Sequence, residues 1–225
     1  DLNDMLQSLM EYVQVERVTL NQKRDFMRIY LMSEKLIHKK YIATEAGMQK
    51  MLEKRAMNYQ KLFHPDYKLM CGKKQDGTFE ENFSPLKWGG NFTEGNSWHY
   101  TWSVFHDPQG LMDLMGGKDV FATMLDSVFS VPPTFDDSYY GFPIHEIREM
   151  TVMNMGNYAH GNQPIQHMIY LYNYAGQPWK AQYWVREVMN RMYTPGPDAY
   201  CGDEDNGQTS AWYVFSALGF YPVCP

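Results

Sequence analysis

A carboxylate in an aromatic, glycine-flanked turn is the first group that could do chemistry. Glu94 lies in the segment Trp88-Gly-Gly-Asn-Phe-Thr-Glu94-Gly-Asn-Ser-Trp98. Apolar surroundings disfavour the charged form of a carboxyl group, so this setting suits a protonated side chain that acts as a general acid. The indoles of Trp88 and Trp98 are candidate substrate-binding groups. The alternative is that Glu94 caps the helix starting near Asn96, or is simply exposed.

An acidic run before the last predicted helix is the second candidate. It reads Gly202-Asp203-Glu204-Asp205-Asn206-Gly207-Gln208. Adjacent carboxylates repel one another unless a cation or a function offsets the cost, so Asp203, Glu204 and Asp205 indicate a cation site or another functional site. A calcium loop of the EF-hand type is excluded, because its last ligand is a glutamate and Val214 stands at that position. Helix N-capping is the alternative.

The third candidate has two parts. In His145-Glu146-Ile-Arg-Glu149, residues 146 and 149 share a helical face. Asn162 and Gln163 come just before a predicted helix start, and their amide oxygens, like the Glu149 carboxylate, suit a hard cation or a sugar hydroxyl. Ordinary capping and a solvated Glu–Arg face are the alternative. A zinc protease is excluded, because the fifth residue of this motif is Glu149 where histidine is required.

The spacing of apolar residues predicts an all-α chain, and no stretch alternates for long enough to predict a strand. Helices in antiparallel pairs, joined by long loops that carry the polar and aromatic residues, indicate part of an α/α toroid. The predicted helices cover residues 2–14, 21–38, 43–63, 97–105, 108–115, 118–129, 144–155, 164–176, 178–193 and 208–218. Proline at the first turn and glycine after the last mark several of these boundaries.

Composition narrows the classes of function. The net charge of −6 argues against a nucleic-acid partner, and no apolar run approaches the length of a membrane span. The three cysteines, Cys71, Cys201 and Cys224, fit neither a disulfide framework nor a metal-finger spacing, although one pair could form. The 17 methionines lie mainly at apolar helical positions and are expected in the core.

Five segments, taken in order, resemble glycoside hydrolase family 92. The resemblance runs from about residue 20 onward, and the acidic run followed by Ser-Ala-Trp-Tyr and the Glu-Gly-Asn-Ser-Trp turn are its most specific parts. The five segments are Thr93–Trp98, His145-Glu146, His160-Gly-Asn-Gln-Pro164, Tyr170–Trp179 and Gly202–Tyr213.

That resemblance implies an exo-acting α-mannosidase that inverts the anomeric centre and needs bound Ca²⁺. The family fold is an N-terminal β-sandwich followed by an (α/α)6 catalytic domain. Residues 1–225 are expected to be the later part of that catalytic domain, with the β-sandwich missing from this chain. The parent protein is expected to be periplasmic or extracellular and to act on mannose-containing glycans.

The resemblance also implies residue roles. Glu94 resembles the family's general acid, Asp205 its general base and Asp203 the partner of that base. The pair His145-Glu146 matches the one that contacts the leaving-group sugar in members cleaving α-1,2 bonds. The oxygen-bearing candidates for calcium are Glu149, Asn162, Gln163 and the Asp203/Asp205 loop.

Two rival functions stay open at this point. One is an inverting α/α-toroid glycosidase of different sugar specificity, which would need no metal and would survive a chelator. The other is a carbohydrate-binding or inactive fragment, which would bind mannose without turnover.

Overall fold

The computed structural model describes residues 45–223 and divides the chain into two compact units, residues 1–57 and 58–225. In the first unit α3 (Glu45–Ala56) is described, and a short 3-10 helix, η1 (Met57–Lys61), follows it. These two elements cover most of the helix predicted over 43–63. The helices predicted over 2–14 and 21–38 lie outside the described residues.

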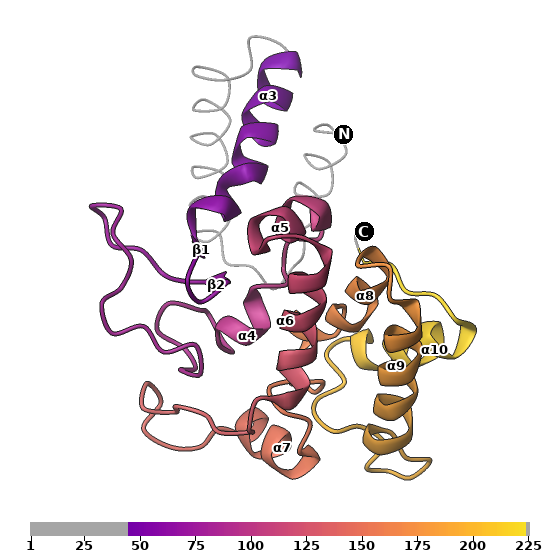
Figure 1. Cartoon of the computed structure of the whole chain (residues 1–225). Coiled ribbons are helices and arrows are strands. Elements are labelled where there is room, and N and C mark those ends of the chain that lie inside the picture. The colour runs from indigo at the N-terminus through magenta and orange to yellow at the C-terminus, as the bar shows by residue number, and fades with distance from the viewer. Residues whose placement is uncertain (1–44, 224–225) are drawn as a thin grey trace, which may run out of the picture. The chain divides into compact units, whose positions relative to one another are not determined.

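The second unit confirms the all-α class, with loops almost as extensive as the helices (Figure 1). α5 packs against α6, and α8 packs against both α9 and α5. The elements of this unit are β1 (Phe63–His64), β2 (Leu69–Met70), α4 (Ser97–Tyr100), α5 (Pro108–Met115), α6 (Lys118–Ser130), α7 (His145–Met153), η2 (Gln163–Ile165), η3 (Met168–Tyr170), α8 (Leu171–Tyr174), α9 (Pro178–Met192) and α10 (Gln208–Leu218).

Helices with strong end signals have the bounds that the sequence predicts. The Asp107 side chain accepts a hydrogen bond from Gly110 N at 2.9 Å and caps α5, which ends at Gly116 with φ 104°. α10 has the predicted bounds as well, and it ends at Gly219 with φ 87°. A positive φ is accessible to glycine at little cost, so glycine ends these helices sharply.

Two predicted helices are wrong in length. The one predicted over 97–105 is only α4, and the chain turns away after Thr101. The one predicted over 164–176 is a series of short turns, η2, η3 and α8. In that series Ile165 and Gln166–Tyr172 are all buried, so no polar face is available to support one regular amphipathic helix.

A short hairpin was not predicted. β1 and β2 pair antiparallel, with Phe63 opposite Met70, and Lys68 in the connecting turn has φ 55°. Two-residue strands are too short for an alternating pattern to be visible in the sequence.

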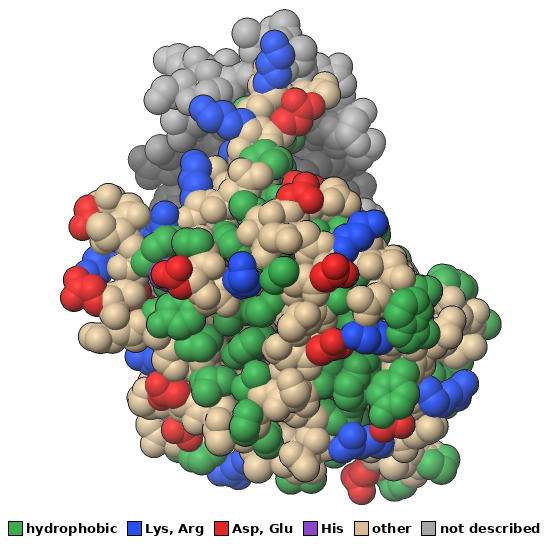
Figure 2. All heavy atoms as spheres, viewed as in Figure 1, with side chains coloured by type: hydrophobic (Ala, Val, Ile, Leu, Met, Phe, Trp, Pro, Cys, Tyr) green, Lys and Arg blue, Asp and Glu red, His purple; other side chains and the backbone are tan. Residues whose placement is uncertain are grey.

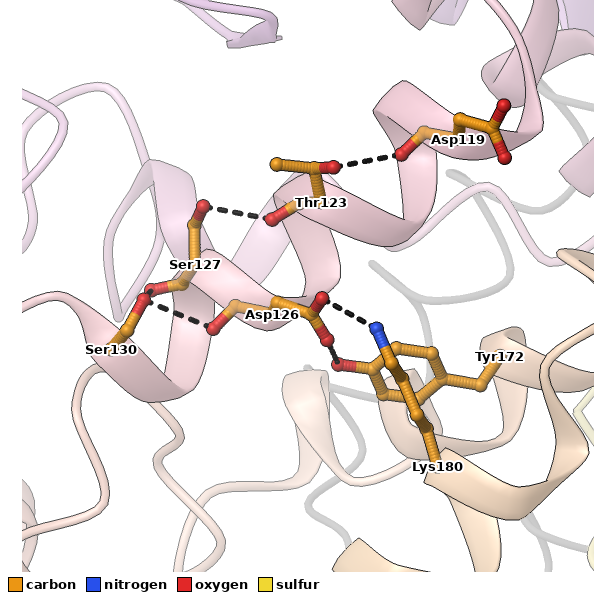
Figure 3. Close-up of polar contacts among 7 residues, drawn as sticks. All are labelled: Asp119, Thr123, Asp126, Ser127, Ser130, Tyr172 and Lys180. Carbon is orange, nitrogen blue, oxygen red and sulfur yellow. Dashed lines mark hydrogen bonds and ion pairs between the residues drawn. The ribbon is translucent and has the colours of Figure 1, made fainter.

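Large aromatic and methionine side chains fill the core, as predicted for the methionines. Trp102, Trp212, Phe121 and Met115 are fully buried. Cys71 and Cys201 are buried and free. Asp126 on α6 joins this core to two other helices, because it accepts hydrogen bonds from Tyr172 of α8 at 2.8 Å and Lys180 of α9 at 2.6 Å (Figure 3).

The surface drawn in Figure 2 mixes acidic and basic side chains without a large patch of one sign. Hydrophobic rings also reach the surface on α9, where Trp179 is 60% and Tyr183 57% exposed. No helix within residues 45–223 is long and apolar enough to cross a membrane.

Candidate active site

The turn that carries Glu94 is held from beneath by a buried polar network. His99 Nδ1 accepts from Asn96 N at 3.1 Å, and His99 Nε2 donates to Asn157 O at 2.9 Å. Burial lowers the pKa of His99 to about 3, so the ring is neutral. Gly95 has φ 63°, and a Cβ there would lie 2.7 Å from His99 Nδ1. His99 therefore caps α4, and Glu94 is left free of that structural role.

Glu94 is half-buried, and the hydroxyl of Tyr100 donates a hydrogen bond to its Oε1 at 3.5 Å. Trp98, four residues further along the chain, is also half-buried. Trp88, in contrast, is fully buried with its ring edge-on to His99 at 5.0 Å. The prediction that Trp88 binds substrate is not supported by this position, because its ring offers no face to a sugar. Trp88 instead lies in the core and supports the turn that carries Glu94.

The acidic run divides into one carboxylate that is hydrogen-bonded to the start of α10 and two that are not. Glu204 accepts from Gly207 N at 2.5 Å and from Ser210 Oγ at 2.6 Å, at the start of α10. These hydrogen bonds hold the pKa of Glu204 below its ordinary value. Glu204 therefore holds the turn before α10, whose N-cap residue is Gly207 and has no side-chain cap. Asp203 is exposed and Asp205 half-buried, and neither is used to cap α10.

The backbone at Asp205 is unusual. Asp205 and its neighbour Asn206 have φ of 55° and 57°, a left-handed conformation that non-glycine residues adopt at a cost. Burial raises the pKa of Asp205, and the charges of Asp203, Glu204 and Glu146 raise it further. A carboxylate whose charge is disfavoured is suited to accept a proton during turnover.

α7 begins with the His145-Glu146 pair and presents Glu149 one turn later. His145 Nδ1 lies 3.0 Å from Glu149 Oε1, and its Nε2 lies 3.4 Å from Glu146 Oε1. The hydrogen bond to Glu149 raises the pKa of His145. The pKa of Glu149 is also raised, because its burial outweighs the effect of the histidine.

Beside this pair, two carboxylate oxygens lack a partner. Glu146 Oε2 and Glu149 Oε2 are buried, and neither accepts a hydrogen bond from the described residues. A Cβ at Gly161 would lie 2.6 Å from Glu149 Oε2, and one at Gly202 would lie 2.8 Å from it. Both glycines are therefore needed for the His-Gly-Asn-Gln turn and the acidic run to approach Glu149.

The amide candidates lie at the start of η2. Asn162 is buried and lines, with Glu146 and Glu149, a cavity of about 10 Å³, the size of one water molecule or ion. Gln163 is exposed, and its Nε2 donates to Asp205 O at 3.2 Å. Across residues 45–223 no three His, Cys, Asp or Glu side chains form a metal-binding group. Any hard cation here would also need amide, backbone or water oxygens.

Electrostatic interactions connect the three candidate segments that the sequence analysis identified. The charge of Glu146 acts on Asp205 and on Tyr140, and the pKa of Tyr140, raised first by its burial, is raised by Glu94 as well. Tyr140 and Tyr100 were not singled out as site residues from the sequence. Tyr140 lies in the aromatic loop before α7, and nothing in the sequence pattern indicated that the charges of Glu146 and Glu94 act on it.

A buried histidine, His160, supports the turn that carries Asn162. His160 Nδ1 lies 2.9 Å from the Tyr158 hydroxyl, and His160 Nε2 lies 2.6 Å from that of Tyr193. Burial lowers its pKa to about 3, so it is neutral and positions the turn that carries Asn162.

Comparison with known proteins identifies the family. The model of the glycosyl hydrolase family 92 catalytic domain matches residues 15–225, and the chain belongs to this family. No curated protein sequence gives a match.

Solved structures agree with this assignment. The GH92 inverting mannosidase BT2199 of Bacteroides thetaiotaomicron VPI-5482 is 59% identical, with a TM-score of 0.63 over 76% of this chain and 23% of that one. The α-mannosidase BT3965 of Bacteroides thetaiotaomicron, in complex with mannoimidazole, is 39% identical, with a TM-score of 0.65 over 76% of this chain and 22% of that one. The GH92 glycosyl hydrolase ccman5 shares the fold at 19% identity, with a TM-score of 0.60 over 80% of this chain and 27% of that one. The chain thus spans about a quarter of the length of these relatives.

Proposed function

We propose that the protein containing this chain is an exo-acting α-mannosidase that hydrolyses terminal α-1,2-linked mannose with inversion. The observation that carries the proposal is the close approach of the His-Gly-Asn-Gln turn and the acidic run to the start of α7, where a Cβ at Gly161 or Gly202 would lie 2.6 or 2.8 Å from Glu149 Oε2. It is supported by membership of glycosyl hydrolase family 92 and by the similarity to mannosidases.

In this proposal Glu94 protonates the glycosidic oxygen as the bond to the anomeric carbon breaks. Asp205, with Asp203 beside it, removes a proton from the water that attacks the opposite face of the ring. An inverting enzyme needs an acid and a base on opposite faces, with room for water between them. Glu94 and Asp205 come from different loops, which suits that requirement.

Calcium is part of the proposal. Glu149, Asn162 and Gln163 would hold the ion, with the Asp203/Asp205 loop beside it, and the unpartnered Glu149 Oε2 fits a cation ligand. A bound Ca²⁺ would polarise sugar hydroxyls and offset the repulsion in the acidic run. These side chains by themselves orient the ring and place the carboxylates. Loss of activity with a chelator and its return with Ca²⁺ would separate this function from a metal-independent glycosidase.

The proposed linkage is based on the His145-Glu146 pair, which resembles the one in α-1,2-cleaving members of the family and offers a donor and an acceptor to the hydroxyls of the neighbouring sugar. A site built to hydrogen-bond a substrate hydroxyl discriminates against an analogue that lacks it. We expect specificity constants of the full-length protein to be highest on α-1,2-mannobiose, ahead of the α-1,3 and α-1,6 isomers. Glu146→Ala should reduce that preference. A preference for another isomer, or one untouched by the substitution, would contradict the assignment.

The proposal extends to the rest of the protein. Residues 1–225 form the later part of an (α/α)6 catalytic domain, and a β-sandwich domain contributes to the pocket. The mannose-containing glycans on which it acts are met in the periplasm or outside the cell. Expression of the chain with and without the rest of its reading frame tests this directly, since the chain alone should bind or turn over mannosides poorly.

A further inference from the structure

Tyr100, the last residue of α4, is held in place independently of any substrate. Its ring stacks on Phe92 with centroids 5.6 Å apart and an interplanar angle of 12°. α4 itself is anchored where Ser97 Oγ donates to Met70 O at 2.6 Å and Thr101 Oγ1 donates to Ser97 O at 2.7 Å. The position of the Tyr100 hydroxyl is therefore set by the stack on Phe92 and by the anchoring of α4.

That hydroxyl reaches back to Glu94. It donates to Oε1 at 3.5 Å, while Oε2 accepts no hydrogen bond from the described part of the chain. The two oxygens of the carboxyl group thus differ in their surroundings. Catalytic hydrogen bonds are often long without substrate and tighten in the reacting complex, so this length is compatible with a role in turnover.

A hydrogen-bond donor next to a general acid can contribute to its reaction. When Glu94 transfers its proton, the side chain becomes a carboxylate, and a hydroxyl already aimed at one oxygen stabilises the new charge without reorganising. Tyr100 stays protonated throughout, because burial and then the charge of Glu94 raise its pKa to about 12. Besides Glu94, the group that acts on it electrostatically is Tyr140.

We propose that Tyr100 is a positioning residue for the acid, which holds Oε1 of Glu94 so that the proton to be transferred sits on Oε2. In this step the Oε2 proton passes to the glycosidic oxygen and the bond from that oxygen to the anomeric carbon breaks. The water oxygen forms the new bond to the anomeric carbon and loses a proton to Asp205. Tyr100 keeps its own proton and donates to the carboxylate that remains. This inference rests on the proposed function.

The test is Tyr100→Phe in the full-length protein. The ring and its stack on Phe92 are retained, so the fold should be unaffected. On α-1,2-mannobiose we expect kcat to fall about 10- to 100-fold, the range for one hydrogen bond to a charged group. On 2,4-dinitrophenyl α-mannoside, whose leaving group needs no proton, kcat should stay within about threefold, and KM should be unchanged on both substrates.

A matched control is Tyr183→Phe, which removes the hydroxyl of an exposed tyrosine on α9 and should leave both rates unchanged. Equal losses of kcat on the two substrates would show that Tyr100 is only structural, and full activity on both would overturn the proposal as well. If the wild-type full-length protein releases no mannose, the proposed function fails, which is a separate outcome.

Discussion

The glycine pair beside Glu149 gives a quantitative test of how the site is built. Gly202→Ala adds one methyl carbon, which would lie 2.7 Å from Gly161 Cα, 2.9 Å from Gly161 O and 2.8 Å from Glu149 Oε2. Two of these neighbours are backbone atoms, so rotation of a side chain cannot relieve the contact. Adding a methyl group to a packed site costs about 1–3 kcal/mol.

We therefore expect Gly202→Ala to lower the free energy of unfolding of the full-length protein by about 1–3 kcal/mol, measured in urea with the metal removed. Because the methyl group also displaces Glu149, we expect calcium to bind about 10- to 100-fold more weakly by titration calorimetry.

The control is Gly196→Ala. Its nearest neighbour would be Thr194 Oγ1 at 3.9 Å and its φ is not in the left-handed region, so both quantities should stay at wild-type values. If Gly202→Ala matches this control in stability and in calcium binding, the close approach of the acidic run to Glu149 is not what builds the site.

Three further predictions follow from the same geometry. Glu94→Gln should lower kcat on α-1,2-mannobiose about 10²- to 10⁴-fold but change a dinitrophenyl mannoside much less, and equal losses would contradict the acid role. Glu204→Gln should lower the melting temperature with turnover retained, whereas Asp205→Ala should abolish turnover with little change in melting. Because the pKa of Glu204 is depressed, its stabilising effect is present above the ordinary carboxyl pKa and is lost as pH falls through the lowered value, which melting curves against pH would reveal. Burial and then the charge of Glu149 raise the pKa of the Cys201 thiol to about 12, so iodoacetamide at pH 8 should label it only after unfolding, and labelling of the native protein would refute the buried position.

End signals made some elements predictable. Pro108 and Gly116 enclose α5, and Gly207 and Gly219 enclose α10, so the sequence alone predicts both helices with the observed bounds. The turns between Gln163 and Tyr174 are bounded by similar signals, Pro164 and Gly176, but residues 165–172 between them are all buried. A helical pattern of apolar residues cannot distinguish one helix from several turns when no polar face is present.

The candidate site was predictable by residue type but not by role. Acidic residues next to a helix start look alike in sequence, and only its hydrogen bonds to Gly207 N and Ser210 Oγ distinguish Glu204 from Asp203 and Asp205. Burial is likewise set by tertiary packing, which is why Trp88 looked like a sugar platform and lies in the core. The hydrogen bond between Tyr100 and Glu94 forms because the chain turns back within six residues. No spacing rule predicts such a turn.

The central claim is that Glu94 and Asp205 act as acid and base on opposite faces of the sugar. The most direct measurement is the anomeric form of the mannose first released from the methyl glycoside of α-1,2-mannobiose by the full-length protein, followed by proton NMR before mutarotation. Single displacement predicts β-mannose as the initial product. If α-mannose appears first, the reaction passes through a covalent intermediate, and Asp205 cannot be the base that activates water.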